Sequence, residues 1–306
     1  MRHKDTELKL ALFSLLAVMC LILGSSTLAM PSKAASFPLT IIDGLNREVT
    51  VPRPPQRLVA LTPSITENLF ALGLGDKVVG VSSYSDYPLA AQNIPVVGDA
   101  FQLNYEQILL LEPDLIVGDA QLVSNHMAKL EELDLPLLAI NPTNLQEVME
   151  DLLIIGKATD ALGAAQQVID EMQVKIQHVQ GVVADLPETV RPLVFVEVWD
   201  EPLMTCGPGS FMQELIELAG GRNLAADADS SWVEYSSELV VERDPEVILL
   251  TRPYVGEVMA RSAWQEIRAV KNGRVVAVDS DPFVRTTPRL ADALVELVGI
   301  LHPDSF

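Results

Sequence analysis

Residues 162–184 read LGAAQQVIDEMQVKIQHVQGVVA, and this stretch decides how the chain is divided. Apolar residues recur along it every three or four positions, which places them on one face of a helix. They are Val168, Met172, Ile176, Val179 and Val183. Asp160 is expected to cap the start of this helix, and Pro187 follows its end. At 1.5 Å per residue the helix is about 33 Å long, which is the diameter of a small domain.

The sequences on the two sides of this helix repeat one pattern. Residues 104–117 read NYEQILLLEPDLIV, and residues 236–249 read SSELVVERDPEVIL. Each begins with a capping residue, places a glutamate (Glu106 or Glu238) in the first helical turn, and continues through a proline into an apolar strand. A repeat this long indicates two similar lobes, because solenoid repeats are only about 20–50 residues long. Chance similarity between generic helix–strand units is the alternative.

Strands and helices alternate at short spacing in both halves, which is typical of parallel sheets. The predicted strands are 57–61, 78–81, 115–117 and 137–140 in the first half, and 193–198, 247–250 and 275–278 in the second, after an entry hairpin of 39–42 and 47–51. We therefore predict an α/β fold of two similar lobes, each a mainly parallel sheet flanked by helices, joined by one long bridging helix. The predicted parts are a signal peptide and leader at 1–36, an N-terminal lobe at 37–158, the bridging helix at 159–188 and a C-terminal lobe at 189–306.

The first 36 residues have the order of a secretory signal. Arg2, Lys4 and Lys9 precede an apolar run from residue 10 to 23, and small residues follow up to Ala29. We expect export to the periplasm or to the outer face of the cytoplasmic membrane. Two alternatives remain open, an uncleaved anchor and lipidation of Cys20, although Met19 is bulky for the position before a lipidated cysteine.

Cleavage of this segment leaves Cys206 as the single cysteine, so we expect no internal disulfide. The chain carries a net charge of −21. That charge disfavours nucleic acid and anionic lipid as partners, and it suits docking on a basic protein surface.

Catalytic signals are sparse. The four histidines are scattered, without the spacing of a metal site. Neither a Gly-x-Ser-x-Gly elbow nor a phosphate loop ending in Gly-Lys-Ser/Thr occurs. We therefore expect no catalytic residues, no metal and no resident cofactor, and we keep a two-lobed enzyme such as a metal chelatase as a distant alternative.

Aromatic and polar side chains instead follow predicted strand ends, where open α/β sheets bind ligands. They are Tyr84, Tyr87 and Phe101 in the first lobe, and Trp199, Met204, Trp232, Tyr235, Phe283 and Arg285 in the second. In a chain with few aromatics, this placement favours a large, partly apolar ligand held by flat contacts. The alternative is that each of these side chains covers a small core.

Four stretches, in order along residues 55–300, resemble the periplasmic vitamin B12-binding proteins of ABC importers. They are TPSITE at 62–67, SSYSDYP at 82–88, the Trp232 region before Ser236, and DPFVRTTPR at 281–289. The wider group includes receptors for iron-siderophores and haem. The resemblance implies two α/β lobes, one bridging helix, and a ligand bound in the cleft between the lobes.

The resemblance also implies roles for individual residues. Tyr84 and Trp232 match positions that touch the corrin ligand, and Met204 and Phe283 fall near other such positions. Ala100 and Asp119 stand where that family has tryptophans, and Phe101 is placed to compensate. Arg285 is a further candidate, able to grip an anionic siderophore or a haem carboxylate as well as a corrinoid.

Glu106 and Glu238 match the pair that docks one glutamate per lobe onto arginines of the permease. The resemblance thus predicts a monomeric, non-enzymatic receptor that binds cobalamin or a related corrinoid and delivers it to an ABC importer permease. The alternative ligand is a ferric siderophore or haem.

Overall fold

The computed structural model describes residues 36–99 and 101–304 of the 306-residue chain. Cys20 and almost all of the predicted signal segment 1–36 lie outside the described residues, and so does Ala100. Within the described ranges, no helix has both the length and the apolar character needed to cross a membrane.

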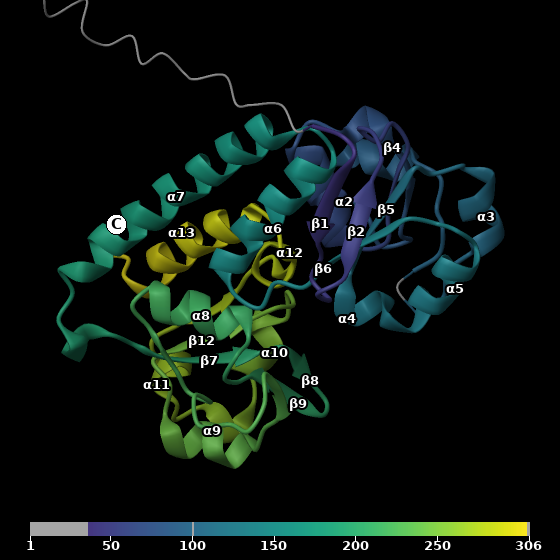
Figure 1. Cartoon of the computed structure of the whole chain (residues 1–306). Helices are drawn as coiled ribbons and strands as arrows, with labels where there is room; N and C mark the ends of the chain where they lie inside the picture. The colour runs from purple at the N-terminus through teal and green to yellow at the C-terminus, as the bar shows by residue number, and fades with distance from the viewer. Residues whose placement is uncertain (1–35, 100, 305–306) are drawn as a thin grey trace, which may run out of the picture. The chain divides into compact units, whose positions relative to one another are not determined.

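The first lobe contains a four-stranded sheet in the order β4-β3-β5-β6, in which all neighbours are parallel. Its strands are β3 (Leu58–Ala60), β4 (Val78–Val81), β5 (Leu115–Asp119) and β6 (Leu137–Ile140). Its helices are α2 (Pro63–Ala71), α3 (Tyr105–Leu110), α4 (Ala120–Val123) and α5 (Met127–Glu132), and the entry hairpin is β1 (Leu39–Ile42) with β2 (Glu48–Val51) (Figure 1). Because side chains alternate along a strand, one face of the sheet packs on α2 and the other on α3, α4 and α5.

The second lobe repeats this topology, with a parallel sheet in the order β10-β7-β12-β13. Its strands are β7 (Leu193–Glu197), β10 (Arg222–Asn223), β12 (Val247–Leu250) and β13 (Val275–Ala277). Its helices are α8 (Phe211–Leu218), α9 (Ser237–Arg243), α10 (Val255–Met259), α11 (Arg268–Lys271), α12 (Ser280–Val284) and α13 (Arg289–Leu301). In each sheet the strand that comes first in the sequence, β3 or β7, is second across the sheet. The strand that follows the glutamate-bearing helix, β5 or β12, is third. The predicted repeat of two similar α/β lobes is confirmed.

The described residues also contain short 3-10 helices at Gly75–Lys77, Leu89–Asn93, Ser124–His126, Glu188–Val190 and Ser262–Trp264. The last of these contains Trp264, which is buried. The 3-10 helix Ser124–His126 lies between α4 and α5.

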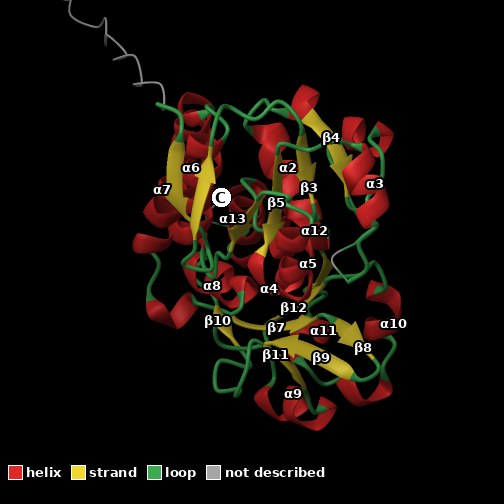
Figure 2. Ribbon diagram, turned by 45° about the vertical axis from the view of Figure 1, so that its right-hand side comes forward, coloured by secondary structure: helices red, strands yellow, loops and turns green. Residues whose placement is uncertain are grey.

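One sheet was not predicted. β8 (Trp199–Asp200), β9 (Leu203–Cys206) and β11 (Trp232–Glu234) form a small antiparallel sheet in the order β11-β9-β8 (Figure 2). β8 and β11 have only two and three residues, which is too short for an alternating pattern to be detected. Cys206 is the last residue of β9, where its thiol is buried.

The long helix α7 spans Leu162–Ala184, as predicted. Its start differs from the prediction, because Asp160 does not cap it. Asp160 instead has a φ of 58°, in the turn between α7 and the preceding helix α6 (Leu145–Ala158), and the N-cap of α7 is Ala161 without a side-chain bond. Asn144 caps α6 by accepting a hydrogen bond from the N–H of Glu147 at 2.9 Å.

Buried side chains of α6, α7, α8 and α13 join the apolar faces of both large sheets in one continuous cluster. Ile155 of α6, Ala165 and Met172 of α7, and Leu297 of α13 are each at most 2% exposed. Along α7 these helices lie side by side (Figure 1). The two lobes therefore share one core through this helical layer.

We expect the Gly156→Ala variant to be less stable, because α6 and α7 approach closely at Gly156. A Cβ there would lie 2.7 Å from the Ala165 Cβ and 3.3 Å from the Ala161 oxygen. Neither group is the end of a flexible side chain, so the helices must shift, and the free energy of unfolding should fall by about 1–3 kcal/mol. Chemical denaturation measures this change.

The matched control is Gly181→Ala on α7, where an added Cβ meets open space. Alanine forms helix better than glycine, so this variant should be neutral or more stable by up to about 1 kcal/mol. Equal effects of the two substitutions would show that the helix contact at Gly156 is not tight.

A second prediction concerns Asp151 of α6, which is 8% exposed and has one carboxylate oxygen without a described partner. Burial, followed by the charges of Glu147 and Asp119, raises the pKa of Asp151 to about 7. The folded state binds the Asp151 proton more tightly than the unfolded state does. Protonation of Asp151 therefore stabilises the fold fully below pH about 4, and this stabilisation is lost as the pH rises through about 7. We expect Asp151→Asn to exceed the parent in free energy of unfolding by about 2–4 kcal/mol at pH 8.

The gap between Asp151→Asn and the parent should shrink steadily as the pH falls from 8 to 4, when followed by denaturation at each pH. Asp170→Asn, an exposed change on α7, is the control and should track the parent throughout. A gap that does not vary with pH would contradict the raised pKa.

Candidate functional site

Segments that follow the carboxyl ends of the two parallel sheets are joined by hydrogen bonds from one lobe to the other. Asn68 of α2, which follows β3, donates from Nδ2 to the Thr286 carbonyl oxygen at 3.0 Å, and Thr286 lies in the segment after β13. The N–H of Leu145, just after β6, donates to Glu214 Oε2 at 2.9 Å. We call these carboxyl ends the facing edges of the two sheets. Open α/β sheets bind ligands at such edges, so the candidate site is sought there.

Arg285 takes part in the polar contacts between the lobes. Its Nη1 is 2.8 Å from Glu67 Oε1 and 2.7 Å from Asp86 Oδ1, and its Nη2 is 2.7 Å from Asp281 Oδ2. Glu67 and Asp86 belong to the first lobe, and Asp86 lies in the loop that carries Tyr84. The hydrogen bond from Arg285 lowers the pKa of Asp86. Arg285 therefore holds this loop, and three carboxylates balance its charge.

Arg289 strengthens the same junction. Its Nη1 is 3.2 Å from Glu67 Oε1, and its Cζ lies 4.2 Å from the centre of the Tyr87 ring. Glu67 is 3% exposed and pairs with both arginines, so its charge is matched within the protein. Sequence reasoning missed Glu67 as an inter-lobe residue, because its partners lie more than two hundred residues away.

Three of the predicted ligand residues present their rings to solvent. Tyr84 is 65% exposed, Phe101 is 82% exposed and Trp232 is 45% exposed. Tyr84 follows β4, whereas Trp232 lies on β11 of the other lobe. Ring surface that is not covered by the fold is available for contact with a ligand.

The register of the small sheet places Trp199 on the same face as two of the predicted ligand residues, Met204 and Trp232. Met204 of β9 is opposite both Trp199 of β8 and Glu234 of β11, and Trp232 is opposite Cys206. Opposite residues, and residues two apart, share a face. Trp199, Met204 and Trp232 therefore lie on one face of the sheet, together with Cys206 and Glu234, and we call it the tryptophan face.

The other side of this sheet is used for packing, since Leu203 and Tyr235 pack against the second-lobe core. Trp199 is 41% exposed, and its position at the end of a predicted strand was the signal available for choosing it.

Phe283 is placed differently from the other predicted residues. It is fully buried, on α12, within the core shared by the lobes. Because its ring is buried, Phe283 is not available to a ligand in this structure and is not among the proposed contacts.

Asp119 ends β5 and caps α4, accepting hydrogen bonds from the N–H groups of Gln121 at 3.0 Å and Leu122 at 3.2 Å. Burial raises the pKa of Asp119 above its ordinary value. Asp119, which stands where the resembled family has a tryptophan, therefore stabilises the start of α4.

Glu106 and Glu238 occupy equivalent places in the two lobes. Asn104 caps α3 through the N–H of Gln107 at 3.0 Å, and Ser236 caps α9 through the N–H of Glu238 at 3.1 Å. Both glutamates lie in the first turn, both are exposed, and neither has an ion-pair partner among the described residues. Their carboxylates are free to meet a partner.

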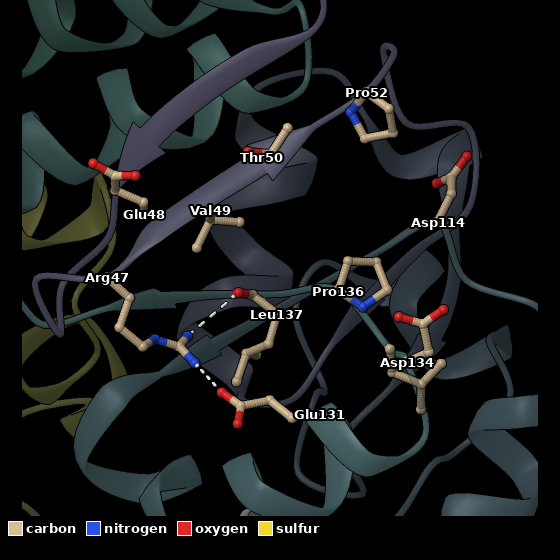
Figure 3. A pocket seen from close by; sticks show the side chains of 11 residues that line it. Arg47, Glu48, Val49, Thr50, Pro52, Asp114, Glu131, Asp134, Pro136 and Leu137 are labelled. Atoms are coloured by element: carbon tan, nitrogen blue, oxygen red, sulfur yellow. Dashed lines mark hydrogen bonds and ion pairs between the residues drawn. The ribbon is translucent and has the colours of Figure 1, made fainter.

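A cavity of about 520 Å³ lies elsewhere, between β2 and the start of β6 (Figure 3). Asp114 and Pro136 line it and precede β5 and β6, so it lies at the amino ends of these strands, away from the facing edges. Arg47 in its wall is already paired with Asp43 at 2.7 Å and Glu131 at 3.2 Å. In the described part of the chain, no group of three or more His, Cys, Asp or Glu side chains is arranged to hold a metal ion.

Comparison with known proteins agrees with this architecture. The sequence pattern of the periplasmic binding protein family matches residues 58–282. An uncharacterized ABC transporter substrate-binding lipoprotein of Bacillus subtilis is 34% identical over 280 residues, covering 90% of this chain and 88% of that protein. A vitamin B12-binding protein of Vibrio cholerae is 31% identical over 252 residues, covering 82% and 90%.

Solved structures are similar as well. The crystal structure of a periplasmic vitamin B12-binding protein of Vibrio cholerae has a TM-score of 0.73 at 30% identity, covering 81% of this chain and 97% of that one. A periplasmic haem-binding protein of Roseiflexus has a TM-score of 0.71 at 25% identity, covering 82% and 99%. The chain therefore belongs to the periplasmic binding protein family, and it is a substrate-binding protein of the ABC-transporter type.

Proposed function

We propose that the protein binds cobalamin or a related corrinoid between the facing edges and delivers it to the permease of an ABC importer. The observation that carries this proposal is the tryptophan face, where Trp199, Met204 and Trp232 share one side of the small sheet and both tryptophan rings are partly exposed. Tyr84 and Phe101 are exposed in the first lobe. A corrin ring is large and partly apolar, and flat aromatic side chains suit such a ligand.

The relatives support the same ligand, because two of those compared here are named for vitamin B12 binding. A ferric siderophore or haem is the second candidate, and the likeness to a haem-binding protein favours it. Arg285 was the residue expected to grip an anionic ligand of that kind. Its three carboxylate partners leave little of its charge for such a ligand.

We predict that Trp232→Ala lowers the affinity for cyanocobalamin by about 1–3 kcal/mol, the usual cost of removing an aromatic anchor. Isothermal calorimetry measures the change. Val174→Ala, at an exposed apolar position of α7, is the control and should bind as the parent does. If Trp232→Ala also binds as the parent does, Trp232 is not part of the site.

We propose further that Glu106 and Glu238 dock the protein on its permease, outside the cytoplasm, with the receptor acting as a monomer. An exposed, unpaired carboxylate at the same place in each lobe gives two matched points of contact with basic groups. Charges of this kind steer association and set the register of a complex. The net charge of −21 acts in the same direction.

For the Glu106→Ala, Glu238→Ala double variant we predict ligand affinity within about twofold of the parent and a strong loss of complex formation with the cognate permease. Binding of the parent should weaken as salt rises, because exposed charges are screened over about 8–10 Å. Pull-down with purified permease at several salt concentrations measures both effects.

The matched control removes the same amount of charge elsewhere, through Asp76→Ala with Glu188→Ala at two exposed positions. This control should retain the complex. If the two double variants lose it equally, net charge and not the glutamate pair governs docking.

A further inference from the structure

Arg252 is a cation at the facing edges that has no carboxylate partner among the described residues. It follows β12, and the preceding Thr251 donates from N–H to the Glu197 oxygen at 3.2 Å and from Oγ1 to the Val198 oxygen at 3.1 Å. These bonds bring Arg252 beside Trp199. The Arg252 Cζ lies 3.2 Å from the centre of the Trp199 ring.

Other arginines near this edge are neutralised. Arg261 makes two short contacts with the buried Glu197, at 2.5 and 2.7 Å, and Arg285 and Arg289 both pair with Glu67. The chain has 42 acidic and 21 basic side chains, so carboxylates are abundant. A guanidinium left without one, at the edge where this fold binds ligands, has its charge available to a ligand.

The geometry suits recognition of an anion. The guanidinium lies over the Trp199 ring, with Cζ 3.2 Å from the ring centre, and none of its N–H groups is used in a described hydrogen bond. Arginine donates two parallel hydrogen bonds to a carboxylate or a phosphate. Trp199 belongs to the tryptophan face with Met204 and Trp232, so an anion bound here lies next to the apolar contact area.

We propose that Arg252, positioned by Trp199, binds an anionic group at the rim of the ligand. The inference rests on the proposed function, and in a complete corrinoid this group is the phosphodiester of the nucleotide loop. Arg252 thereby discriminates between corrinoids that carry this phosphodiester and those that lack it.

The test compares cyanocobalamin, which has the phosphodiester, with dicyanocobinamide, which lacks it. Calorimetry with Arg252→Gln should show an affinity for cyanocobalamin about tenfold lower or more, since charge-assisted hydrogen bonds are lost. The affinity for dicyanocobinamide should change by less than about twofold. Arg252→Lys keeps the charge without the planar fork, so its loss for cyanocobalamin should be smaller than that of Arg252→Gln.

Arg53→Gln makes the same substitution at an exposed arginine away from the facing edges and should leave both affinities unchanged. Thermal unfolding of each variant checks that the fold is kept, which is expected because the Arg252 side chain makes no hydrogen bond among the described residues. If Arg252→Gln weakens both corrinoids equally, or neither, the inference is overturned while the proposed function stands.

If the parent binds no corrinoid, the proposed function fails, and haem is compared with haem dimethyl ester by absorption titration. Selective loss of haem binding in Arg252→Gln would then support the anion site with a carboxylate in place of the phosphodiester. Equal effects on haem and its ester, or no binding of either by the parent, overturn the inference.

Discussion

The structure depends on the continuous apolar core that joins the two lobes through α6, α7, α8 and α13. Each large sheet buries one face against this helical layer. Separating the lobes would expose side chains such as Leu152 and Leu297, which are fully buried, at about 25 cal/mol for each Å² of apolar surface. The facing edges are therefore held at nearly fixed positions before any ligand arrives. A preformed site loses less ordering free energy on binding than a hinged one.

The polar contacts between the lobes have a different role from this core. Burial of Glu67 between Arg285 and Arg289 gains little net stability, because the desolvation of three charges offsets much of their attraction. Removing one partner would leave a buried charge unmatched, so the set fixes a single geometry. Asp86 extends it to the loop of Tyr84. In this way a residue of the second lobe positions a proposed ligand contact of the first.

Sequence patterns predicted the helices and strands whose apolar residues recur with a local period. The bounds of α7, β6 and β12 agree with the prediction, and the repeat around Glu106 and Glu238 correctly indicated two sheets of one topology. The patterns failed where partners are distant in sequence or strands are very short. The small sheet, the ion pairs of Arg285 and the burial of Phe283 all depend on contacts between segments far apart in the chain.

In the proposed function, the positions of the two glutamates would link ligand capture to delivery. Val97 N–H donates to the Val81 oxygen at the end of β4, and Asn104 N–H donates to the Val97 oxygen, so α3 begins at the carboxyl edge of the first sheet. Helix α9 begins directly after β11, beside the tryptophan face. Glu106 and Glu238 therefore lie at the same ends of their lobes as the proposed ligand contacts. A permease that binds both carboxylates meets the protein on its ligand side, and a released ligand need not pass around either lobe to reach it.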